Sequence, residues 1–213
     1  MKSDDLRNYK ILFMADGETD YLFLEKVFRD DPDLSPLPIT MLRPEDVNLK
    51  RRVGGGHDTL RKELGFAAIK AAQGYADGVF ALVDNDGDAR FQFPHEHACG
   101  DCRECEAQAE LRKIHWGQPF EKGAAILFQA LETLLLSTRN DFTPQLEESL
   151  HHENLKVRLY GRHFNNPDDM FVAFQKVLSQ ITIHDITARA YPRLKQHLSA
   201  MVRIENRDSC RKE

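Results

Sequence analysis

Acidic residues follow two apolar, strand-like runs of the chain. Residues 11–15 lie shortly before Glu18, and residues 79–83 lie directly before an acidic triplet formed by Asp84, Asp86 and Asp88. If both runs are parallel strands of one sheet, these carboxylates meet at its carboxyl edge, where open α/β folds bind their ligands. Carboxylates repel one another unless a cation lies among them, and such hard oxygen ligands suit Mg²⁺ or Mn²⁺. The pattern therefore predicts metal-dependent chemistry on a phosphate group.

Other interpretations of the acidic triplet fit the sequence less well. A calcium-binding loop needs Gly at position six and an acid at position twelve, where this chain has Ala89 and His95. A phosphatase-type site, in which Asp84 attacks phosphorus, leaves Glu18 unexplained. A plain polar turn is the ordinary structure of an isolated acidic turn, but the second acidic strand end favours a site. Whether Asp16 or Glu18 faces the cation stays open.

Apolar periodicity predicts the elements that must position these residues. Strands over 8–15, 37–42 and 79–83 alternate with helices over 19–29 and 58–74. This order is typical of a parallel sheet covered by helices. Further along, the pattern predicts a strand over 155–160 and three helices, over 123–138, 167–180 and 187–202, the last interrupted near Pro192.

Length and composition predict a single cytoplasmic α/β domain. The 213 residues are 41% hydrophobic, which allows a sizeable core. The start of the chain is highly charged and no apolar run approaches the length of a membrane span, so we expect no membrane association. We expect a core over 9–90 and 122–160, an insertion over 89–121 and a helical extension over 161–213.

Charge is unevenly distributed along the chain. Residues 154–213 contain 11 Lys and Arg against 6 Asp and Glu, so the net charge of −5 combines +5 there with −10 in residues 1–153. An acidic metal-binding part joined to a basic tail suits an enzyme of nucleic acids, because the tail can contact phosphates. A solvated basic helical surface explains the tail equally well.

The acidic strand ends resemble the TOPRIM domain of topoisomerases, primases and OLD-family nucleases. Gly17-Glu18 after the first strand and the triplet Asp84-x-Asp86-x-Asp88 after the third carry this resemblance, which covers about residues 9–90. Residues 125–136 and 191–195 are more distantly similar to small uncharacterised TOPRIM-like proteins. The resemblance implies Mg²⁺-dependent cleavage or transfer at a phosphodiester, with Glu18 as general acid/base and the aspartates as metal ligands.

The leading function hypothesis is a Mg²⁺- or Mn²⁺-dependent nuclease that acts on DNA or RNA, in phage defence or DNA repair. The alternative is a catalytically silent TOPRIM-like module that binds a partner ATPase or nucleic acid. A phosphatase or nucleotidyl transferase is a third possibility.

Glu132 is the only charged residue of the predicted helix over 123–138. Burying an unpaired carboxylate is costly, so it should pair with a cation or take up a proton. One interpretation is a second metal site beside the aspartates, as in two-ion mechanisms. The other is a buried ion pair with Arg139 or with a basic residue of the C-terminal helices.

The predicted insertion contains a cluster of metal-ligating residue types. Three of the four cysteines fall within seven residues, and two histidines lie just upstream: His95, His97, Cys99, Cys102 and Cys105. Closely spaced thiolates and imidazoles suit a tetrahedral Zn²⁺ that stabilises a loop too small for its own core. Free surface thiols are the equally weighted alternative.

A glycine-rich loop before the second predicted helix is a candidate phosphate-binding segment. It contains Arg51, Arg52, Gly55 and His57. Glycines let the backbone approach a phosphate, and the amide groups that begin the next helix attract anions. The loop lacks the Gly-Lys-Ser/Thr ending of a nucleotide-binding P-loop, so ATP binding is not expected, and a flexible solvated turn is the alternative.

Overall fold

The computed structural model describes nine parts of the chain: residues 8–15, 17–50, 56–84, 107, 109–111, 123–128, 131–149, 152–188 and 190–209. Four strands form one parallel sheet in the order β2-β1-β3-β4. They are β1 (Tyr9–Met14), β2 (Ile39–Leu42), β3 (Gly78–Asp84) and β4 (Gly123–Phe128). The predicted α/β class and parallel sheet are confirmed.

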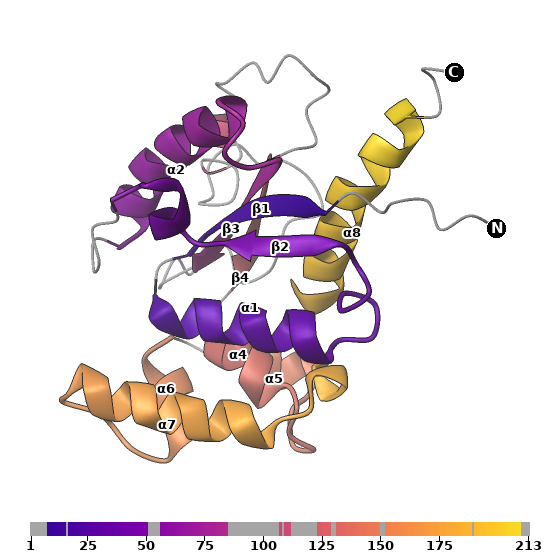
Figure 1. Ribbon diagram of the computed structural model, residues 1–213. Helices are drawn as coiled ribbons and strands as arrows, with labels where there is room; N and C mark the ends of the chain where they lie inside the picture. Colours follow the sequence, from indigo (N-terminus) through magenta and orange to yellow (C-terminus); the bar gives the residue numbers. More distant parts are fainter. Residues whose placement is uncertain are drawn as a thin grey trace.

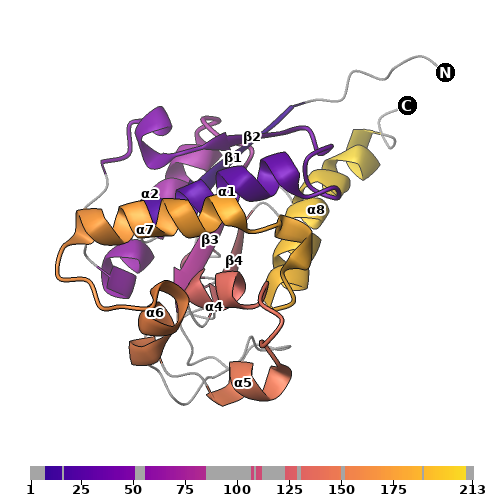
Figure 2. The same ribbon diagram turned by 90° about the horizontal axis from the view of Figure 1, so that it is seen from below.

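Helices cover both faces of this sheet. They are α1 (Glu18–Asp30), α2 (Gly56–Ala72), α4 (Leu131–Leu136), α5 (Pro144–Ser149), α6 (His152–Tyr160), α7 (Pro167–Gln180) and α8 (Ala190–Ser209), with short 3₁₀ helices η1 (Pro44–Val47) and η2 (Ile183–Asp185). Figure 1 shows α2 on one side of the sheet and α1 and α4 on the other. Seen from below, α7 lies alongside α1 (Figure 2), against which it packs.

Residues 11–14 of β1 and 79–83 of β3 are buried on both faces of the sheet, which explains these two unbroken apolar runs. Ile11 and Phe13 of β1 face the core under α1, whereas Leu12 and Met14 face the core under α2. The side chains of β3 alternate between the same two cores. Such alternation follows from the two-residue repeat of a strand, and continuous apolar runs are typical of parallel strands covered on both sides.

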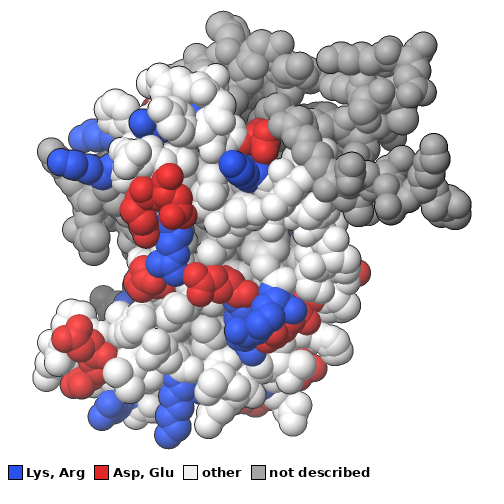
Figure 3. All heavy atoms as spheres, in the orientation of Figure 1, with Lys and Arg blue, Asp and Glu red and all other residues white. Residues whose placement is uncertain are grey.

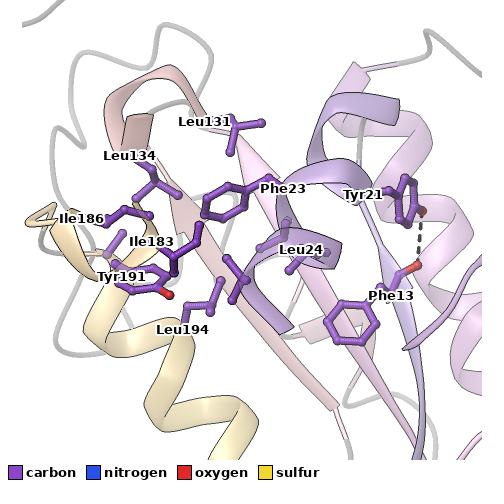
Figure 4. Close-up of a cluster of buried hydrophobic side chains, with 14 of the residues drawn as sticks. Phe13, Tyr21, Phe23, Leu24, Leu131, Leu134, Ile183, Ile186, Tyr191 and Leu194 are labelled. Atoms are coloured by element: carbon purple, nitrogen blue, oxygen red, sulfur yellow. Dashed lines mark hydrogen bonds between the residues drawn. The ribbon is translucent and has the colours of Figure 1, made fainter. Parts of the chain in front are cut away.

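The larger core joins α1 to helices from the second half of the chain. Phe23 and Leu24 of α1 pack with Leu134 of α4 and with Ile183 and Leu194 (Figure 4). All five side chains are almost fully buried. Burying one such side chain stabilises the fold by roughly 1.5–3 kcal/mol, so α8 is an integral part of this core.

Two predicted elements differ from the structure. Residues 123–138 do not form one helix: the apolar stretch is divided between strand β4 and the short helix α4. Residues 155–160, predicted as a strand, belong to helix α6. Leu155, Val157 and Leu159 alternate as in a strand, but Leu155 and Leu159 also stand four residues apart, and Leu155 packs with Leu136 of α4 while Leu159 lies against the same cluster.

The remaining predicted elements are confirmed within a few residues at their ends, except that the helix predicted over 187–202 continues to Ser209 as α8. The helix predicted over 167–180 has those bounds as α7. The predicted interruption at Pro192 is wrong, because Pro192 lies in the first turn of α8, where a missing N–H breaks no helical hydrogen bond. Among the described residues, no helix is both long and apolar enough to cross a membrane.

Candidate active site at the carboxyl edge of the sheet

Three acidic residues follow neighbouring strands at one edge of the sheet. Glu18 begins α1 after β1, Asp84 ends β3, and Glu132 lies in the first turn of α4 after β4. Met14 pairs with Ala81, and Asp84 pairs with Phe128, so the three parallel strands end toward the same side. The prediction that the two apolar runs are parallel strands of one sheet is confirmed, and the two strands are adjacent.

The start of α1 is fixed by a hydrogen bond across its first turn. Gly17 is the N-cap, with extended backbone, and its N–H donates to the Asp20 carboxylate at 2.7 Å. Asp20 is buried, so its carboxylate has a structural role at the helix start. Glu18 is the first helical residue, where the amide dipoles favour a negative charge.

Arg43 contacts two carboxylates of α1. It is the first residue after β2, and its Nη1 donates to Glu18 at 2.8 Å while its Nη2 donates to Glu25 at 2.7 Å. The Arg43 side chain is 24% exposed, against 52% for Glu18 and 45% for Glu25. Sequence analysis did not predict these partners of Arg43, because they are 25 and 18 residues away.

Neighbouring groups restrain Arg43. Its guanidinium lies 5.0 Å from the centre of the Tyr21 ring, and its backbone N–H donates to Asp46 at 2.7 Å. Tyr21 is itself fixed by its hydroxyl, which donates to the Phe13 carbonyl (Figure 4). Burial alone would lower the pKa of Arg43, but the hydrogen bonds to Glu25 and Glu18 outweigh it and raise the pKa above its usual value.

The ion pair places the Glu18 carboxylate beside the segment that follows β2. Strand β1 lies between β2 and β3, so Arg43 and Asp84 follow strands on opposite sides of β1. Thus Glu18 and Asp84 share an edge of the sheet, while the described contacts of Glu18 are with Arg43. On the face seen in Figure 3, acidic and basic side chains lie next to one another in several places.

Glu132 differs from its predicted setting. It was predicted in the middle of a helix, but the residues before it form strand β4, so it lies in the first turn of α4. Its side chain is half-buried. Burial, together with the nearby charge of Glu132, raises the pKa of Tyr160 above its usual value. Arg139, one of the basic residues predicted as an ion-pair partner of Glu132, pairs with Asp141 at 3.2 Å.

Most of the other predicted ligands lie outside the described residues. This applies to Asp86 and Asp88, to the phosphate-loop residues Arg51, Arg52 and Gly55, to Asp16, and to the predicted zinc ligands His95, His97, Cys99, Cys102 and Cys105. His57 lies in the first turn of α2. In the part of the chain that is described, no three His, Cys, Asp or Glu side chains are grouped as a metal site would require.

Comparisons with protein-family models, curated proteins and solved structures found no match to this chain. The resemblance to the TOPRIM domain therefore rests on the residues of its acidic motifs.

Proposed function

We propose that this protein is a Mg²⁺- or Mn²⁺-dependent nuclease, or a related phosphodiester-processing enzyme of the TOPRIM type. One observation carries the proposal: Glu18, Asp84 and Glu132 follow three neighbouring parallel strands at one edge of the sheet. Carboxyl edges of parallel sheets are where such folds bind ligands. DNA or RNA is the substrate, and a role in phage defence or DNA repair follows from the resemblance.

Each acidic residue has a role in this proposal. Asp84 and Glu132, with Asp86 and Asp88 beyond them, supply carboxylate oxygens, the donor type that suits Mg²⁺ or Mn²⁺. The bound ion supplies positive charge that polarises the phosphodiester. Glu18 is about half exposed at 52%, so its carboxylate is open to a substrate and moves the proton as general acid/base.

The test measures cleavage of labelled single-stranded DNA, duplex DNA and RNA with Mg²⁺ or Mn²⁺. We expect Glu18→Gln to lower the rate at least about 10²-fold, since positioned proton transfer contributes about 10²–10⁴-fold. Asp84→Asn should also lower the rate, because it removes a carboxylate from the proposed metal site. Asp30→Asn is the matched control, because it removes a carboxylate from the opposite end of α1. Wild-type protein that cleaves none of these substrates, alone or with a partner, contradicts the proposal.

The ion pair of Glu18 favours a second candidate function. A carboxylate held by Arg43 at 2.8 Å is neutralised, as expected in a catalytically silent module that binds a partner ATPase or nucleic acid. A biological activity that survives both Glu18→Gln and Asp84→Asn favours this second function. Loss of activity in both variants, with normal folding, favours the enzyme.

A further inference from the structure

We infer that Arg43 is a phosphate-binding residue of the sheet edge, and that it exchanges Glu18 for a phosphate oxygen when nucleic acid binds. The inference deepens the proposed function and rests on it, because it takes the carboxyl edge of the sheet as the nucleic-acid site.

The position of Arg43 is the first support. It follows β2 directly, and Glu18 begins α1 shortly after β1 ends at Met14, so both lie at the edge that carries Asp84 and Glu132. A nucleic-acid backbone whose phosphates reached the acidic residues would also contact Arg43 beside them. A group of carboxylates without a cationic side chain would repel such a ligand.

The contacts of Arg43 are of a kind that can be exchanged. Its guanidinium makes one hydrogen bond to Glu18 and one to Glu25, and both carboxylates are about half exposed. Exposed ion pairs of this kind contribute only about 0–1 kcal/mol. Glu18 can therefore be released at little cost, while Glu25 and the Tyr21 ring keep the guanidinium in place.

The chemistry of the guanidinium suits the new partner. Arginine stays charged, and its planar set of N–H donors matches a phosphate as well as a carboxylate. Exchange of one acceptor for the other moves no proton. Release would also free the Glu18 carboxylate from its present partner, so that binding of a phosphate at Arg43 makes Glu18 available for proton transfer.

The experiment measures binding of fluorescein-labelled oligothymidylate by fluorescence anisotropy, in EDTA and over a series of salt concentrations. Arg43→Gln should weaken binding about tenfold and reduce the magnitude of the salt slope by about 0.7, the value for one phosphate contact to a single strand. Arg29→Gln is the matched control: Arg29 is 69% exposed at the other end of α1 and should leave the slope unchanged.

A double-mutant cycle separates exchange from simple charge repulsion. Glu18→Gln should tighten binding several-fold in the wild-type background, because Arg43 loses its competing acceptor. That gain should vanish in the Arg43→Gln background. A gain of equal size in both backgrounds overturns the inference, and so does an Arg43→Gln variant that is folded by circular dichroism but keeps the wild-type slope.

The binding assay needs neither metal nor cleavage, so it fails independently of the proposed function. If cleavage is never found but the binding cycle gives the expected pattern, the inference holds and the enzyme proposal falls. If cleavage is found and Arg43→Gln leaves the salt slope unchanged, only the inference falls. Wild-type protein that does not bind the oligonucleotide overturns the inference.

Discussion

Near each end of helix α1, acidic side chains contact a basic side chain. The two groups of charged residues differ in burial. At the first end, Arg43 pairs with Glu18 and also reaches Glu25 in the middle of the helix, and both carboxylates are about half exposed. Beyond the last turn, Asp31 is only 1% exposed and accepts a hydrogen bond from the Tyr191 hydroxyl at 2.6 Å. Lys195 lies 3.4 Å from the same carboxylate and also pairs with Asp33.

This difference separates a structural cluster from one that can exchange partners. Besides Tyr191 and Lys195, the Asp31 carboxylate accepts backbone N–H groups from Asp33 at 2.8 Å and Leu34 at 3.2 Å. A buried carboxylate with all of these donors is costly to disturb, because removing it leaves them unsatisfied. The half-exposed carboxylates at the other end lose little when they are hydrated.

Among the variants at the two ends of α1, Asp31→Ala should have the largest effect on stability. We expect it to lower the free energy of unfolding by about 3 kcal/mol, since it breaks a buried, hydrogen-bonded pair. Urea unfolding followed by circular dichroism measures the change. Asp33→Ala is the control, because Asp33 lies in the same turn, also contacts Lys195 and is 66% exposed, and it should cost about 0.5 kcal/mol. Equal losses in the two variants would contradict the structural role of Asp31.

Tyr191→Phe should have the next largest effect, a loss of about 2 kcal/mol, because it removes one hydrogen bond to a charged group. The ring still fills its place in the core, where Tyr191 is buried. The double variant with Asp31→Ala should lose less than the sum of the two single losses, since both remove the same contact. Strictly additive losses measured by urea unfolding would show that the two side chains are not coupled.

Acidification should weaken the same cluster. Burial alone would raise the pKa of Asp31, but hydrogen bonds from Tyr191 and from the Asp33 amide, with the charge of Lys195, outweigh it and lower the pKa. Because the pKa of Asp31 is lower in the folded state than in the unfolded chain, the ionised carboxylate stabilises the fold at pH values above the ordinary pKa near 3.8. This stabilisation is lost as the pH falls through the lowered pKa of the folded state. Urea midpoints below that pH should fall more steeply for wild type than for Asp31→Asn. Parallel pH profiles would contradict this origin.

The smallest expected effect is that of Arg43→Gln on stability. We expect a loss of about 0.5 kcal/mol that shrinks in high salt, because the ion pairs are partly exposed and screened. Urea midpoints at low and high salt measure it, with Arg29→Gln as the control. A salt-independent loss comparable to that of Asp31→Ala would make the Arg43 cluster structural, and the contrast between the two ends of α1 would disappear.

Local sequence patterns were sufficient to predict those elements whose sequence fits only a strand or only a helix. The runs that became β1 and β3 are short, apolar and bounded by polar residues, and α7 begins with the N-cap Asn166 followed by Pro167. The boundary between β4 and α4 was missed because the strand and the helix lie within one continuous apolar stretch of the sequence. In such a stretch, periodicity does not distinguish a strand from a helix.

The sequence predicted which segments form the candidate site but not the partners of their side chains. Strand order brings the segments that follow β1, β3 and β4 to one edge, and an alternating element order predicts this from sequence. The partners of Glu18 and Asp31 were not predicted. Arg43 and Tyr191 meet them only through tertiary packing, and no local spacing indicates which charges will be adjacent.

The hydrogen bond between Tyr191 and Asp31 joins residues 160 positions apart. A ribosome that has made the first three strands has therefore supplied the backbone donors of Asp33 and Leu34 but not yet Tyr191 and Lys195, which complete the compensation of the Asp31 carboxylate. Long-range contacts of this kind slow folding, because the chain must close a large loop before the contact forms. The nascent chain is thus expected to complete its larger core only after residues 191–198 of α8 emerge.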